Sequence, residues 1–167
     1  KMRSMRPLGT VEQAFASAHA DVNGAAMPCF VLHLHGDLSF DRLEETFQVS
    51  KARYWALNQT ITRHHRRCDF KPSQNRVRGR QLLRENETTW QSVAEDELNR
   101  PIDPNTEALM RFTLLSPAPG AVQDHDLLIT THHAIIDGIA MLDFIETLLA
   151  DYAGQPRTLA QTKIEPS

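Results

Sequence analysis

The stretch that decides the fold is 127-LLITTHHAIIDGIAMLDFI-145, where a strand-like apolar segment is followed by apolar residues at helical spacing. Residues 126–131, DLLITT, have an apolar centre and predict a buried strand. Residues 139–152 carry apolar side chains at helical spacing and end before Gly154, a typical helix stop. Polar residues that end a buried strand often form active sites in sheets that carry helices. The loop that joins this strand to this helix is therefore the first place to look for function.

The rest of the sequence also contains both helix-like and strand-like segments. Ser39 is a predicted N-cap of a long helix that reaches toward residue 62, and Thr10 is a predicted N-cap of an earlier helix. A short helix is expected over 91–99. Strands are predicted at 28–35, 66–71, 77–85 and 109–115. Helices and strands are interleaved without a repeat, which favours the α/β (α+β) class: a two-layer fold with helices packed on a mixed β-sheet.

Composition describes an ordinary globular chain. It has 167 residues, 41% hydrophobic and 23% charged, with a formal net charge of −3. No apolar run approaches the ~20 residues that cross a bilayer, and the charge gives no general attraction for nucleic acid. Cys29 and Cys68 form no CxxC pair, so we expect two free thiols in a cytoplasmic protein. We expect a tag or a disordered start at 1–6, one subdomain at 7–153, and at 154–167 a linker toward a further part of the protein.

The loop holds His132-His133 and Asp137-Gly138, and histidine is the side chain best suited to exchange a proton near neutral pH. Adjacent residues of an extended segment point to opposite sides, so the two histidines are expected to have different tasks. A metal site from His132, His133 and Asp137 lacks a further ligand at a recognisable spacing, so no metal is predicted.

The string HHAIIDG at 132–138 matches HHxxxDG, and with it the chain resembles the condensation-domain superfamily. This group includes condensation domains of nonribosomal peptide synthetases, polyketide-associated and alcohol acyltransferases, and relatives with the chloramphenicol acetyltransferase fold. Three other stretches are similar to the family: RPLGTVEQAF (6–15), the strand 29–35 with the residues that follow it, and RPIDPNTEALMRFTLL (100–115). The resemblance runs from about Arg6 to Tyr152.

The resemblance implies the N-terminal half of an acyltransferase whose tunnel runs between two halves. An acyl group would pass from a thioester, acyl-CoA or acyl-phosphopantetheine, to a hydroxyl or amine, with His133 as the general base. His132, Asp137 and Gly138 would support it. Aligning 63-RHHRRCDF-70 on the family's arginine segment makes Arg67 the partner of Asp137, although Arg66 replaces a family leucine.

The same resemblance sets expectations about partners. No tightly bound cofactor is expected. The expected partners are a missing C-terminal half, the acyl thioester, the acceptor and an acyl carrier protein. The isolated chain is expected to have little or no activity.

Alternatives remain open at this point. One is a non-catalytic binding or scaffold domain with the same fold, and another is a metal-dependent hydrolase. The eight Lys and Arg residues of 63–84 suggest a nucleic-acid patch, a phosphate site or a charged hairpin at a sheet edge. No aromatic residues alternate with them to stack on bases, so the hairpin is favoured. His33 and His35 are predicted to lie at the surface, and Tyr54, Trp55 and Trp90 are predicted to pack.

Overall fold

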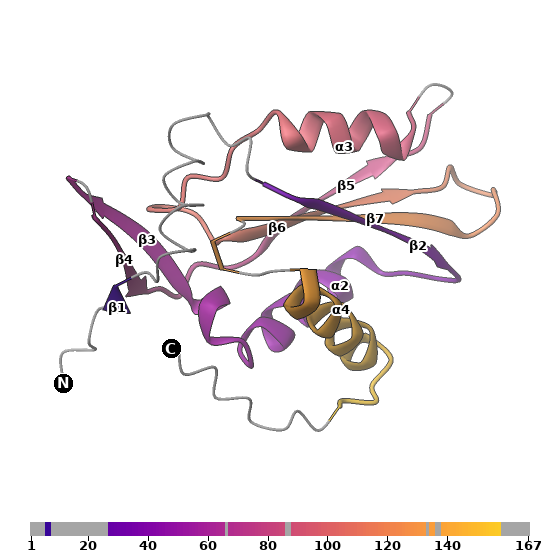
Figure 1. Cartoon of the computed structure of the whole chain (residues 1–167). Helices are drawn as coiled ribbons and strands as arrows, with labels where there is room; N and C mark the ends of the chain where they lie inside the picture. Colours follow the sequence, from indigo (N-terminus) through magenta and orange to yellow (C-terminus); the bar gives the residue numbers. More distant parts are fainter. Residues whose placement is uncertain are drawn as a thin grey trace.

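The computed structural model describes residues 6–7, 27–65, 67–85, 88–132, 134–135 and 138–157. Figure 1 shows its helices and strands. In chain order they are β1 (Arg6–Pro7), β2 (Cys29–His35), α2 (Phe40–Lys51), the 3₁₀ helix η1 (Trp55–Asn58), β3 (Gln59–His64), β4 (Arg67–Pro72), β5 (Arg78–Leu83), α3 (Trp90–Leu98), β6 (Met110–Ser116), β7 (Asp124–Thr131) and α4 (Gly138–Tyr152).

The described strands form two sheets. A four-stranded sheet has the order β2-β7-β6-β5, in which only β5 and β6 run parallel, and a three-stranded antiparallel sheet has the order β1-β4-β3. Helices α2 and α4 cover one face of the four-stranded sheet, and α3 covers the other (Figure 1). The predicted α+β class with a mixed sheet is confirmed, and α3 adds a helix layer beyond the two that were expected.

Alternation along the strands divides the core between the two faces of the larger sheet. Phe30 and Leu32 of β2 face α2 and α4, whereas Val31 faces α3. Phe112 of β6 stacks on Phe47 of α2 with ring centroids 4.2 Å apart. The Phe112 ring also lies against Gly79 of the neighbouring strand β5, where a Cβ atom would come within 2.1 Å of it. This absence of a side chain lets Phe112 fill the layer between sheet and helix.

Most predicted boundaries are confirmed. The structure has strands close to 28–35, 109–115 and 126–131 and helices close to 91–99 and 139–152. Ser39 accepts a hydrogen bond from the Arg42 backbone N–H as the N-cap of α2. Gly154 has a φ of +71° just past the end of α4. The helix predicted after Thr10 lies outside the described residues, and the expected tag at 1–6 and linker at 154–167 stay predictions.

The prediction of one long helix from Ser39 toward residue 62 is wrong. Helix α2 ends at Lys51, and β3 begins at Gln59 after the short helix η1. The stretch Thr60-Ile61-Thr62 consists of β-branched residues, which favour a strand. Ile61 pairs with Phe70 of β4. The apolar residues that suggested one helix therefore belong to two elements: the first lie on the buried face of α2, and Ile61 lies on the buried face of β3.

The predicted hairpin between residues 66–71 and 77–85 is also wrong. Strand β4 pairs with β3 in the small sheet, and β5 pairs with β6 in the large one. Between them the chain passes under α2, where the Gln48 side chain binds both the N–H and the C=O of Val77, at 3.1 and 2.8 Å. Strand β5 does lie at a sheet edge, and α2 satisfies the backbone just before it.

We predict that Gly79→Ala destabilises the chain, because the added methyl group would enter the space of the Phe112 ring. Overpacking of a filled core typically costs about 1–3 kcal/mol. Urea unfolding should show this loss, whereas Gln81→Ala, at an exposed position of the same strand, should stay within about 0.5 kcal/mol of the wild type. Equal stability of the two variants would contradict the close approach of β5 and Phe112.

Candidate functional site

The motif follows β7, a strand that lies between β2 and β6 and is buried over nearly its whole length. At its end the His132 backbone N–H donates to the Leu109 carbonyl at 2.9 Å, and the Thr131 hydroxyl donates to the same oxygen at 3.2 Å. Leu109 immediately precedes β6. The start of the motif is therefore fixed to the start of the neighbouring strand.

His132 is fully buried and shapes the turn that follows. Its ring Nδ1 accepts a hydrogen bond from the Ala134 backbone N–H at 3.2 Å, and its carbonyl accepts one from Ile135 at 3.3 Å. A neutral imidazole that accepts through Nδ1 carries its proton on Nε2. Protonation of Nδ1 would break the bond to Ala134, so this geometry favours a neutral ring.

The turn after His132 lies where the two sheets meet. Ala134 is buried in a cluster with Leu109 and with three residues of the small sheet: Ile61, Cys68 and Phe70. Ile135 packs against this cluster and against the main core under α2 and α4. Both sheets thus contribute to the position of the motif.

His133 and Asp137, the predicted base and its supporting carboxylate, lie outside the described residues. Gly138 is the first residue of α4. The buried face of α4, which includes Met141, Phe144 and Leu148, belongs to the main core and sets the direction of the helix that follows the motif. The roles of His133 and Asp137 stay predictions.

Arg67, the predicted partner of Asp137, is the first residue of β4. Its side chain is 66% exposed, and its Nε lies 3.2 Å from an Asp69 carboxylate oxygen. Cys68 and Phe70 point into the cluster around Ala134, so alternation along the strand directs Arg67 to the opposite face of β4. The pairing with Asp137 stays a prediction, and Asp69 is the partner that the described residues provide.

The two other predicted histidines lie at the surface, as expected. His33 and His35 sit opposite Asp126 and Asp124 on the neighbouring strand. The Nδ1 atoms of the two rings lie 2.5 and 2.6 Å from the carboxylate oxygens of these partners.

The predicted packing residues differ in exposure. Trp55 is 51% exposed, with its ring edge-on to Phe70. The Tyr54 hydroxyl donates to Asp143 of α4 at 2.6 Å and lies 2.8 Å from the Thr147 hydroxyl. Burial and the bond to Asp143 raise the pKa of Tyr54 to about 12. Tyr54 is thus a packing residue that also ties η1 to α4.

A buried ion-pair network around Glu97 was not predicted from the sequence. Glu97 of α3 is fully buried and binds three guanidinium groups: Arg80 of β5 at 2.9 Å, Arg100 at 2.7 Å and Arg111 of β6 at 2.7 Å. Thr113 donates to it at 2.9 Å. The only signal in the sequence is the spacing of three between Glu97 and Arg100, because the other partners come from separate strands.

The network changes the acidity of Glu97. Burial alone would raise the pKa of this carboxyl, but the hydrogen bonds and charge of Arg111, with Thr113 and Arg100, outweigh it and lower the pKa to about 2 from 4.5. Glu97 is therefore ionised at neutral pH.

Two features of the described residues bear on other functions. No three His, Cys, Asp or Glu side chains are grouped so that they could hold a metal ion, a statement that does not reach His133 or Asp137. In the part of the chain that the structure describes, no helix has the length and apolar character that a membrane span requires.

Two curated proteins are similar in sequence, and both are components of the linear gramicidin synthase of Brevibacillus parabrevis. One is 32% identical over 115 residues, which cover 64% of this chain and 2% of that protein. The other is 30% identical over 131 residues, or 74% of this chain and 2% of that protein. No protein-family model matches the chain. The chain thus spans a small fraction of the relatives it matches.

Solved structures are similar in fold. The starter condensation domain of the rhizomide synthetase RzmA superposes with a TM-score of 0.79 at 12% identity, over 94% of this chain and 40% of that one. The condensation domain of the monacolin K polyketide synthase MokA gives a TM-score of 0.75 at 12% identity, over 95% and 36%. The chain therefore has the condensation-domain, chloramphenicol acetyltransferase-like fold that HHAIIDG suggested, and it spans 36–40% of these solved chains.

We predict that Glu97→Gln lowers the free energy of unfolding at pH 7 by about 3 kcal/mol, because the buried charge that binds Arg80, Arg100 and Arg111 is removed and Arg111, whose side chain is 14% exposed, loses its carboxylate. A carboxyl with a lowered pKa stabilises the fold above its unfolded pKa, and this stability is lost as the pH falls from 4.5 toward 2. Urea unfolding over this range should therefore show the wild type and the variant converging. Glu95→Gln, at an exposed position of α3, is the control. A difference that does not depend on pH would contradict the ion-pair account.

Proposed function

We propose that the chain is the N-terminal half of a condensation-type acyltransferase, which moves an acyl group from a thioester to an amine or hydroxyl acceptor. The observation that carries the proposal is HHAIIDG at the end of β7, in a chain with the condensation-domain fold. Synthases among the sequence relatives and condensation domains among the structural neighbours favour bond formation over hydrolysis. The thioester is carried by CoA or by the phosphopantetheine arm of a carrier protein.

In the proposed reaction His133 is the general base. The acceptor nitrogen or oxygen bonds to the thioester carbonyl carbon while His133 takes its proton, and the C–S bond then breaks. The leaving thiolate receives the proton from the histidine. No covalent acyl-enzyme forms, so neither a serine nor a cysteine nucleophile is required.

His132 is a positioning residue in this proposal. Its bonds to Leu109, Ala134 and Ile135 support it, because they order the residues on either side of His133. Since its Nδ1 is occupied by the Ala134 N–H, His132 is poorly suited to act as a second base. Asp137 is proposed to support the loop, and Gly138 to leave room beside the tunnel.

The chain covers about two fifths of the solved condensation-domain chains. The remaining wall of the tunnel is therefore proposed to come from a C-terminal half, and the isolated chain is proposed to lack transfer activity.

We predict that His133→Ala in the full-length protein lowers the transfer rate by about 10²–10⁴-fold, the usual contribution of a general base, and leaves the fold intact. Product formation from an acyl-carrier thioester is measured by mass spectrometry, and the fold by circular dichroism. His64→Ala, at an exposed histidine of β3, is the matched control. Wild-type rates for His133→Ala would contradict the proposed base.

Asp137→Ala should lower the melting temperature as well as the rate.

A further inference from the structure

The structure separates the basic run of 63–84 into groups with different surroundings. Arg63, Arg67 and Lys71 belong to the small sheet, and Arg84 binds Asp126 at 2.6 Å. Three other arginines of the run come together at the start of β5 with two more that lie far along the sequence. The five are Arg76, Arg78, Arg80, Arg100 and Arg111, and they line a pocket of about 310 Å³.

Several of these guanidinium groups form ion pairs with a carboxylate outside the pocket. Glu97 does not line the pocket, yet it binds Arg80, Arg100 and Arg111 from its buried position between α3 and the sheet. Arg80 uses its Nε for Thr113 and its Nη2 for Asp96 and Glu97, so among the described residues its Nη1 has no partner. The arginines are thus positioned before a ligand arrives, which lowers the cost of ordering them on binding.

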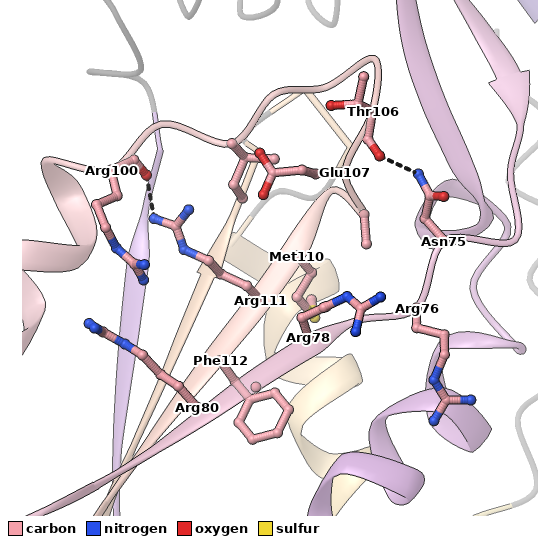
Figure 2. A pocket seen from close by; sticks show the side chains of 13 residues that line it. Asn75, Arg76, Arg78, Arg80, Arg100, Thr106, Glu107, Met110, Arg111 and Phe112 are labelled. Carbon is pink, nitrogen blue, oxygen red and sulfur yellow. Dashed lines mark hydrogen bonds between the residues drawn. The ribbon is translucent and has the colours of Figure 1, made fainter.

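The wall of the pocket carries an excess of positive charge. Its lining has five guanidinium groups and one carboxylate, Glu107, which accepts the Asp103 backbone N–H at 2.7 Å. Outside the lining, Glu45 pairs with Arg76 at 2.7 Å and Asp96 with Arg80 at 2.7 Å, so the excess of positive charge belongs to the wall itself. Arg78 is exposed, and within the described part of the chain its side chain has neither an ion pair nor a hydrogen bond. Figure 2 shows Arg80 and Arg100 on one side of the pocket and Arg76 and Arg78 on the other.

The chemistry of the lining favours a phosphate group over a carboxylate. One guanidinium is enough to bind both oxygens of a carboxylate, whereas a phosphoryl group offers several oxygens to donors from different directions. Ile102, Met110 and Phe112 also border the pocket, but each is at most 2% exposed, so the arginines supply the groups that a ligand would meet. We propose that this pocket binds the phosphate group of an organic phosphate ester.

The pocket and the motif share one end of the large sheet. Strands β5 and β6 begin there and β7 ends there, with Met110 of β6 opposite Thr131 of β7. Two sources of the phosphate fit this position. One is a phosphopantetheine arm that carries the thioester, which rests on the proposed function, and the other is a nucleotide phosphate bound as a separate ligand.

The test is calorimetric titration of the chain with 4′-phosphopantetheine, with pantetheine and with adenosine 3′,5′-bisphosphate. We expect a phosphate ester to bind one site per chain and to bind at least tenfold more weakly to Arg78→Gln and to Arg100→Gln. Arg78→Gln is the cleaner variant, because Arg78 has no ion pair with a described residue whose loss would disturb the fold. Lys71→Gln, from the same basic run but outside the pocket, should bind like the wild type.

The outcomes separate the two sources and the two proposals. Binding of phosphopantetheine but not of pantetheine or the bisphosphate supports the thioester arm, whereas preference for the bisphosphate supports a nucleotide. No saturable binding of either phosphate ester, or equal weakening by Arg78→Gln and Lys71→Gln, would overturn the pocket. Such a result would leave the His133→Ala measurement, and so the proposed function, unaffected.

Discussion

The ion pairs of the Glu97 carboxylate are the interaction on which the large sheet most depends. It lies fully buried under α3 and binds arginines from β5 and β6, while Thr130 of β7 donates to it at 3.3 Å. One charge thus joins a helix and three neighbouring strands. Its ionised form is maintained because the surrounding guanidinium groups more than compensate for the loss of hydration. This network lies on the face of the sheet opposite the main aromatic core.

Fixing β6 against β7 also fixes the motif. The two strands are antiparallel neighbours, so the start of β6 lies beside the end of β7. There Leu109 receives the backbone N–H of His132, and both residues are fully buried. The small sheet completes this arrangement through the apolar cluster around Ala134. The site is therefore built at the junction of two sheets, and the same end of the large sheet holds the arginine pocket.

Local patterns in the sequence predicted the elements whose signals are local. The apolar residues of β7, the helical spacing of α4, the Ser39 cap and Gly154 all gave boundaries that the structure confirms. The predictions failed where pairing partners decide the outcome. Residues 59–64 form a strand because they pair with β4, and β5 pairs with β6 rather than with β4. The Glu97 network was not predictable for the same reason, since Arg80 and Arg111 reach it only in the folded sheet.

A complete transfer site is proposed to need a second half, and this can be measured directly. Single-turnover transfer from an acyl-phosphopantetheinyl carrier protein to an amine acceptor would be followed by mass spectrometry, with the full-length protein and with the 167-residue chain. Circular dichroism would establish that the chain is folded under the same conditions. The half-enzyme account predicts product from the full-length protein and none above background from the folded chain. Comparable rates from both, or no product from the full-length protein, would contradict it.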